Sequence, residues 1–238
     1  MKHFIPFVLF SFSLLEGKCQ DNTKRNFGYD LIDPDWKAQT IQAGVLWETN
    51  NGIKGTAFYN EEWYKGYILL SDNHIAKDIS LRFNIYKNEI YFLLDSQVLV
   101  VSPTMPVAEF GISDQNDSNK ITIFRCGYPA INNNTTKTFY NVVVNNKIAL
   151  LKHYDKRIME ATNSIGAFEK KFIDSESWYI YNSSENKIIQ IKKNKNSLLA
   201  ALPQYANKVQ SIIEEKSLKL KTENEWIILF NELNNQIE

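Results

Sequence analysis

The histidines are the first candidates for acid–base chemistry in this chain. Beyond residue 19 there are two: His74 follows Asp72 by two residues, and His153 precedes Asp155 by two. A histidine that acts as a general base needs an orienting carboxylate and a nearby nucleophile. Neither histidine has a second histidine three to five residues away, the spacing typical of zinc ligands. No catalytic residue, metal or cofactor is therefore assigned, and a hydrolase that uses His74 or His153 with neighbouring acids is the alternative hypothesis.

Carboxylates gather near aromatic residues at two places, Asp33 with Asp35 and Glu61 with Glu62. A glycoside hydrolase needs two carboxyl groups across one sugar, one of them with a pKa raised by burial. The spacing places no two of these groups opposite each other, and exposed positions are more typical of Asp and Glu. The chain also has no Gly-x-Ser-x-Gly elbow and no phosphate-binding glycine loop. These motifs therefore predict no enzyme class.

An aromatic cluster is the sharpest feature that points to binding. Trp47, Tyr59, Trp63 and Tyr64 lie close together in the sequence. Aromatic rings form platforms for sugars or peptides, and tryptophan is common in binding hot spots. Aromatic side chains at strand spacing also fill β cores, which is the favoured interpretation. If the chain binds a ligand, these four residues are the predicted site.

The charges of the chain balance, with 27 Lys and Arg against 27 Asp and Glu in 238 residues. Removal of residues 1–19 would take away Lys2, Lys18 and Glu16, which leaves a net charge of −1. Nucleic-acid binding by bulk electrostatics needs a basic stripe, so a nucleic-acid partner is not predicted. The length suffices for one large or two small domains with a substantial core.

The N-terminus has the layout of a secretory signal peptide. Lys2 precedes an apolar run over residues 4–15, and Gln20 is the expected first residue after cleavage. The run is too short to span a membrane, so no transmembrane segment is predicted after cleavage. Lipidation of Cys19 is left open as an alternative, although Lys18 before it argues against that processing. The chain is therefore predicted to be exported, to the periplasm, the cell envelope or the extracellular space.

Loss of Cys19 would leave Cys126 as the only thiol, so no internal disulfide is predicted. Cys126 ends a strand-like run that begins at Ile121. A small buried apolar residue is the favoured interpretation of Cys126 over a reactive thiol.

The elements that must position these residues are mostly strands. Residues 20–35 are polar and are predicted to be a flexible lead-in. Over residues 36–195 short apolar runs alternate with turn residues, which is typical of an all-β sandwich or barrel. Residues 79–85 alternate apolar and polar side chains, between turns at Asp72-Asn73 and Lys87-Asn88. This body is predicted to be an antiparallel β-roll or partly open barrel.

Residues 196–238 predict a C-terminal helical hairpin packed on the same domain. Ser197 can cap a first helix, and Pro203 marks a break or a new first turn. Thr222 and Glu225 have the spacing of a capping box. One apolar stripe follows, made of Trp226, Leu229, Phe230, Leu233 and Ile237. The predicted class is therefore α+β, mostly β.

Several short segments resemble one group of bacterial proteins. They are residues 55–63 (Gly-Thr-Ala-Phe-Tyr-Asn-Glu-Glu-Trp), 66–72, 81–86, 139–144, 150–154 and 192–199. The pattern is similar to an uncharacterised family of exported, β-rich proteins of the Bacteroidota. This resemblance implies no known activity and transfers no functional residue. The leading hypothesis is an exported, non-enzymatic binding or envelope-associated protein whose partner is a peptide, a glycan or an envelope protein. A purely structural role of the C-terminal helices is a third possibility.

Overall fold

The computed structural model describes residues 43–45, 52–114, 117, 120–162 and 168–237. The predicted signal peptide, the lead-in, Asp33, Asp35 and Trp47 lie outside these residues. The strands are β1 (Ala43–Val45), β2 (Ile53–Lys54), β3 (Tyr64–Leu70), β4 (Ile75–Asn84), β5 (Glu89–Leu94), β6 (Gln97–Val101), β7 (Val107–Ser113), β8 (Ile121–Arg125), β9 (Tyr140–Val144), β10 (Ile148–Thr162), β11 (Phe168–Asn182) and β12 (Lys187–Ile191). The helices are α1 (Lys195–Ala201), the 3-10 helix η2 (Pro203–Tyr205), α2 (Ala206–Glu215) and α3 (Glu223–Asn235).

One open sheet contains all of these strands. Its order is β1-β6-β5-β4-β3-β7-β8-β9-β10-β11-β12, and each pair along this path is antiparallel. The short β2 lies outside the path and pairs in parallel with β11. Within the described ranges the sheet does not close into a barrel. The prediction of a mostly β, partly open fold with helices at its C-terminal end is confirmed.

Strand β4 shows how the sequence pattern produces the sheet. Its alternating residues Ile79, Leu81 and Phe83 are at most 4% exposed. Asn73 and Asn88 stand in the turns on either side with φ of 72° and 57°, a region that asparagine tolerates better than most residues. Both predicted turns are confirmed.

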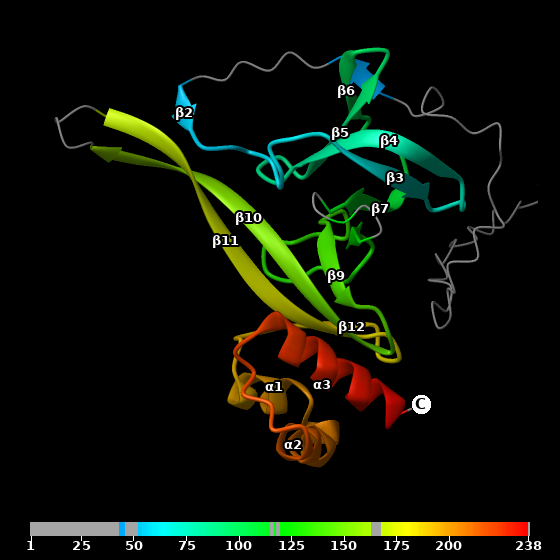
Figure 1. Cartoon of the computed structure of the whole chain (residues 1–238), viewed down its shortest axis with the longest axis vertical. Coiled ribbons are helices and arrows are strands. Elements are labelled where there is room, and N and C mark those ends of the chain that lie inside the picture. The colour runs from blue at the N-terminus through cyan, green and yellow to red at the C-terminus, as the bar shows by residue number, and fades with distance from the viewer. Residues whose placement is uncertain (1–42, 46–51, 115–116, 118–119, 163–167, 238) are drawn as a thin grey trace, which may run out of the picture.

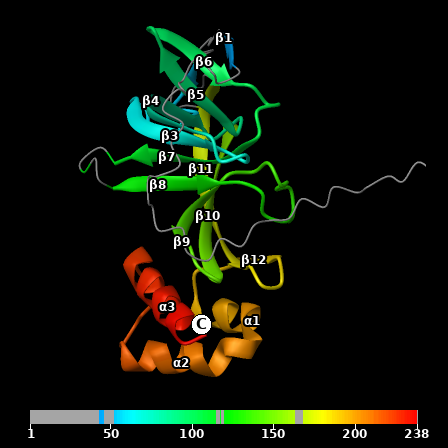
Figure 2. The ribbon, with the colours of Figure 1, turned by 90° about the vertical axis from the view of Figure 1, so that its right-hand side faces the viewer.

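Strands β10 and β11 form a ribbon of 15 residues in each strand, with Ile148 opposite Asn182 and Thr162 opposite Phe168. The whole ribbon lies within the strand-rich body predicted for residues 36–195. In Figures 1 and 2 this ribbon runs between the helices at one end of the molecule and β3 to β8 at the other.

The C-terminal part forms three α-helices and η2 instead of a simple hairpin. Asn194, not Ser197, caps α1, because its side-chain oxygen accepts a hydrogen bond from the Ser197 amide at 2.9 Å. Pro203 opens η2, as its fixed φ allows. The capping box of Thr222 and Glu225 is confirmed at the start of α3.

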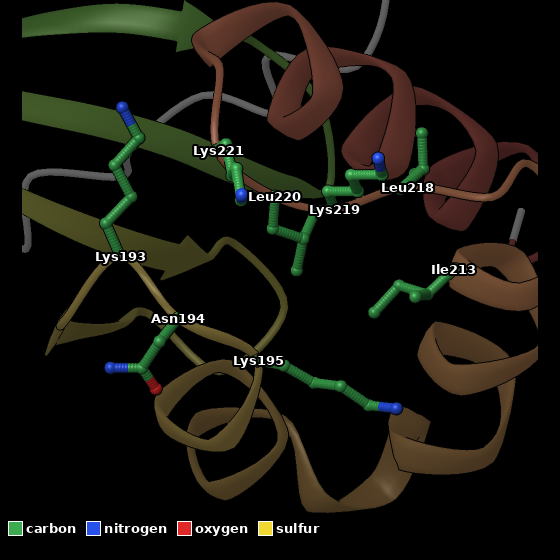
Figure 3. Close-up of a pocket in the computed structure, with 8 residues that line it drawn as sticks. All are labelled: Lys193, Asn194, Lys195, Ile213, Leu218, Lys219, Leu220 and Lys221. Atoms are coloured by element: carbon green, nitrogen blue, oxygen red, sulfur yellow. The ribbon is translucent and has the colours of Figure 1, made fainter.

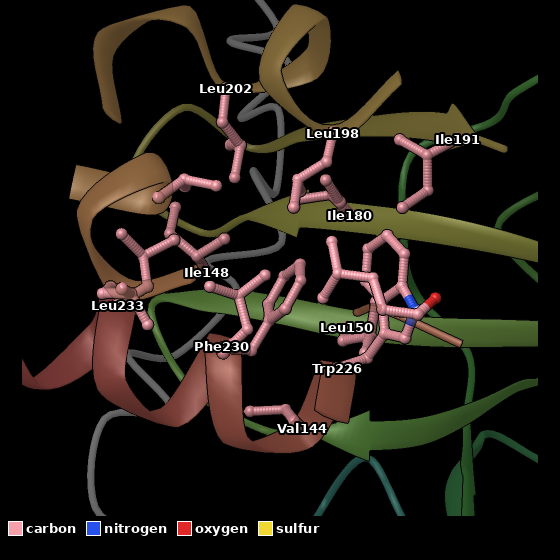
Figure 4. Close-up of a cluster of buried hydrophobic side chains, with 14 of the residues drawn as sticks. Val144, Ile148, Leu150, Ile180, Ile191, Leu198, Leu202, Trp226, Phe230 and Leu233 are labelled. Atoms are coloured by element: carbon pink, nitrogen blue, oxygen red, sulfur yellow. The ribbon is translucent and has the colours of Figure 1, made fainter. Parts of the chain in front are cut away.

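Among the described residues three apolar cores lie along the sheet, and the smallest contains Tyr128, Tyr140, Ala149, Leu151, Tyr179 and Ile188. The helix-side core packs β9 to β12 against the three α-helices (Figure 4). Its fully or nearly fully buried members include Ile148, Leu150, Ile180, Leu198, Leu202, Val209, Ile212, Trp226, Leu229, Phe230 and Leu233. The N-terminal core lies among β3 to β8, and Tyr154 of β10 packs against it. The ribbon therefore contributes to all three cores. None of the described helices is long and apolar enough to cross a membrane.

Candidate ligand pocket

The structure distributes the predicted aromatic site between core and surface. Tyr59 packs on the N-terminal core, with its ring centroid 5.1 Å from that of Phe124 and 5.2 Å from that of Tyr154. Burial raises the pKa of Tyr59 to about 12. Tyr64 packs against the same core, and the ring of Trp63 lies 5.2 Å from the guanidinium carbon of Arg82. Core filling thus accounts for Tyr59 and Tyr64, while a binding role for the four residues stays a prediction.

The two histidines lie in different settings. His74 is exposed in the β3–β4 turn, where its Nδ1 is 3.0 Å from Asp72 Oδ2. A hydrogen bond from the His74 backbone amide lowers the pKa of Asp72. His153 lies half-buried on β10 with its ring 5.6 Å from that of Tyr140, and burial lowers its pKa. The described residues contain no group of three histidine, cysteine or acidic side chains that could hold a metal ion.

Glu61 and Glu62 are exposed, and Asp33 and Asp35 lie outside the described residues, so the predicted grouping of these carboxylates stays untested.

The thiol of Cys126 is half-buried after β8. Its Sγ donates to the Val107 carbonyl oxygen at 3.1 Å. Burial raises the pKa of Cys126 from 9.0 to about 11. The thiol is therefore neutral at physiological pH, in agreement with the interpretation of a packed residue.

We expect Cys126 to react with a thiol reagent at pH 8 about a hundredfold more slowly in the folded protein than in the unfolded chain, since two pKa units separate the thiolate fractions. The pKa of Cys126 is higher in the folded protein than in the unfolded chain. Burial of the neutral thiol therefore stabilises the fold fully below about pH 9, and this stabilisation is lost as the pH rises to about 11. The reaction rate is measured with and without denaturant on a chain that begins at Gln20. Equal rates in the two states would contradict the burial of this thiol.

A pocket of about 390 Å³ lies among the helices, outside every site predicted from the sequence (Figure 3). We call it the lysine-rimmed pocket. Its eight lining residues are Lys193, Asn194, Lys195, Ile213, Leu218, Lys219, Leu220 and Lys221. They come from the β12–α1 turn and the start of α1, from α2, and from the α2–α3 loop. Ligand pockets span roughly 300–1,000 Å³, so this one is at the small end of that range.

The α2–α3 loop forms one wall of the pocket in a strained conformation. Leu220 has a φ of 54°, which a leucine rarely adopts. Its carbonyl oxygen accepts a hydrogen bond from Nε1 of the fully buried Trp226 at 3.1 Å. This conformation turns the Leu220 side chain inward, where it is 6% exposed, while Lys219 and Lys221 on either side remain exposed.

Glu225 fixes this wall from the first turn of α3. Its carboxylate accepts hydrogen bonds from the backbone amides of Thr222, Lys219 and Lys221 at 3.0, 2.9 and 2.8 Å. These donors, Thr222 first, hold the pKa of Glu225 at about 2. The carboxylate thus stays ionised and holds the backbone of both lysines in place.

The other carboxylates of the helical region also have partners away from the pocket. Glu223 pairs with Lys152, and Glu232 with Lys216. The side chains of Glu214 and Glu215 accept hydrogen bonds from Gln210 and Ser211. Among the described residues, none of the four pocket lysines has an ion pair with a carboxylate. The rim therefore contains four lysines and, beside two of them, the ionised carboxylate of Glu225.

Aromatic side chains stand behind the pocket. The Lys193 ammonium lies 4.8 Å from the ring centroid of Trp178, a cation–π contact. The ring of Trp178 is 5.8 Å from that of Trp226. Trp178 and Trp226 both belong to the helix-side core, so the pocket residues that contact them pack against that core.

Sequence reasoning missed this pocket because its parts are distant in the chain. Residues 192–195 and 216–221 are both lysine-rich, which was the available signal. A lysine-rich loop is usually a solvated surface, and only the return of the chain through η2 and α2 brings the two segments together.

Comparison of the chain with protein-family models, with curated proteins and with solved structures gives no match.

Proposed function

We propose that this chain is an exported, non-enzymatic binding protein and that the lysine-rimmed pocket is its binding site for an acidic ligand group. The observation that carries the proposal is the set of four lysines without carboxylate partners in the described structure around one hollow. Like charges held around one hollow repel each other, and a bound anion relieves that repulsion. The envelope protein, peptide or glycan partner expected from the sequence stays a separate prediction from the ligand of this pocket. Export rests on the signal-peptide pattern of residues 1–19, and membership of the Bacteroidota family rests on the resemblance alone.

The hydrolase hypothesis has less support. The residues that line the pocket include no histidine and no carboxylate. His74 and Asp72 meet on an exposed turn, where solvent weakens their interaction. Substitution of His74 or His153 by alanine is therefore expected to leave ligand binding unchanged.

Binding of the anionic fluorophore anilinonaphthalenesulfonate tests the proposed site. We expect the double variant Lys195→Gln/Lys219→Gln to bind about fivefold more weakly than the natural protein, since each exposed charge interaction contributes roughly 0.5 kcal/mol. Added salt should weaken binding to the natural protein, because a Debye length of about 8 Å at physiological ionic strength screens the rim. Both effects are measured by fluorescence titration.

The matched control is Lys87→Gln/Lys137→Gln, which removes two exposed lysines that do not line the pocket. It changes the net charge by the same amount and leaves the pocket intact. The proposal is wrong if both double variants lose affinity equally, or if neither does.

A further inference from the structure

The floor of the lysine-rimmed pocket is apolar although its rim is charged. Ile213 and Leu220 are 9% and 6% exposed, and both belong to the helix-side core. Leu218 packs against that core and is half-buried. In Figure 3 these three side chains project from α2 and the α2–α3 loop, Lys219 and Lys221 come from the same loop, Lys195 extends from the start of α1, and Lys193 points away from them. A purely inorganic anion would use the rim and leave this floor in contact with water.

The rim also limits the kind of acid group. Its charges are ammonium groups on flexible stems, and none of the lining residues is an arginine. Lysine acts as a point charge and does not impose the planar, bidentate geometry that a guanidinium gives. Lysine stems also lie readily along apolar surface while their charged ends remain in water. The rim therefore suits a compact acid group joined to an apolar chain.

We propose that the ligand of this pocket is a single-chain anionic amphiphile, with its acid group among Lys195, Lys219 and Lys221 and its chain on Ile213, Leu218 and Leu220. This inference rests on the proposed function and adds the chemical class of the ligand. The volume of about 390 Å³ favours one short chain over the two chains of a phospholipid. The strained Leu220 has a role in this arrangement, because it places an apolar side chain between two lysines.

Calorimetric titration with four probes tests the class. Decanoate carries both the charge and the chain, octyl glucoside carries only a chain, and acetate and inorganic phosphate carry only charge. We expect decanoate to bind at least tenfold more tightly than each of the other three, because only decanoate satisfies the floor and the rim together.

Two variants separate the parts of the site. Leu218→Gln makes the half-buried part of the floor polar, and we expect it to weaken decanoate binding about tenfold. Lys195→Gln/Lys219→Gln should weaken it about fivefold. The control for the floor is Ile121→Gln, which changes an apolar side chain that is 41% exposed on β8, and it should leave decanoate binding unchanged. Far-ultraviolet circular dichroism identifies any variant that fails to fold. If Leu218→Gln does not fold, Leu220→Asn replaces it, because asparagine tolerates the positive φ at residue 220.

The outcomes distinguish this inference from the proposed function. Equal binding of acetate, phosphate and decanoate would overturn the amphiphile and leave an anion site. Equal binding of octyl glucoside and decanoate, with no effect of the lysine variant, would overturn both. Failure of decanoate and of the anionic fluorophore to bind would also overturn both.

Sedimentation with lipid vesicles distinguishes binding of a free anionic amphiphile from binding of an acidic headgroup in a bilayer. Vesicles that contain phosphatidylglycerol are sedimented with the protein, with and without decanoate. Protein that stays in the supernatant supports a free amphiphile, and sedimentation that decanoate does not reverse would contradict the assignment to this pocket.

Discussion

Replacement of Asn234 by leucine is expected to lower the free energy of unfolding by about 3–5 kcal/mol, because it leaves buried backbone groups without partners. Asn234 is fully buried near the end of α3. Its Oδ1 accepts from the Ile148 amide at 2.9 Å, and its Nδ2 donates to the carbonyl oxygens of Ile148 and Phe230 at 2.9 and 2.7 Å. The amide thus takes the place of a neighbouring strand at the first residue of β10.

Leucine has the same number and branching of side-chain heavy atoms as asparagine but is larger, so no cavity forms, and the loss comes from the missing hydrogen bonds together with the extra volume at a fully buried position. The measurement is chemical denaturation followed by circular dichroism and by tryptophan fluorescence. The control is Asn235→Leu, one residue further along α3, where the side chain is exposed and the expected change is within about 0.5 kcal/mol. If the Asn234→Leu variant unfolds at the same denaturant concentration as the natural protein, this contact does not join helix and sheet.

Replacement of Glu109 by glutamine is expected to cost about 3–5 kcal/mol, because it leaves a buried guanidinium without its counter-charge. The Glu109 side chain is 5% exposed, and the side chain of its partner Arg125 is 16% exposed. Arg125 Nε donates to Glu109 Oε2 at 2.7 Å, and Tyr67 donates its hydroxyl to Oε1 at 2.6 Å. These groups connect β3, β7 and β8 through one carboxylate.

Denaturation of two further variants checks the cause. Glu109→Gln/Arg125→Met removes both charges and should recover part of the loss, as expected when the cost is an unpaired buried charge. Glu232→Gln breaks the exposed pair with Lys216 and should cost less than about 1 kcal/mol. Equal losses in Glu109→Gln and Glu232→Gln would contradict the importance of burial.

The parts of the fold that could be predicted are those where local pattern and burial coincide. The alternation of residues 79–85 gives the buried face of β4, and the turn residues Asn73 and Asn88 end its hairpins. The capping box at Thr222 and the apolar stripe after it likewise give α3. In each case neighbours in sequence supply the whole signal.

The parts that could not be predicted depend on contacts between distant residues. The middle of the β10–β11 ribbon is charged, and its two strands support each other through pairs such as Lys156 with Asp174, 2.9 Å apart. In the sequence Asn234 is a polar residue beside an apolar stripe. Its burial depends on its contact with Ile148, which is distant in the chain. The lysine-rimmed pocket needs residues 193–195 and 219–221 together, so its existence depends on the packing of η2 and α2.

The strand order has a consequence for how this chain folds. Apart from the pairs β3–β7, β1–β6 and β2–β11, every ladder joins strands that follow each other in the sequence. Most loops that must close are therefore short, and short loops close at low entropic cost. The meander from β7 to β12 can form hairpin by hairpin, whereas β3 can pair first with β4 and its other edge must wait until β7 is available. A protein that is mostly sheet thereby forms most of its ladders between strands that are neighbours in the sequence.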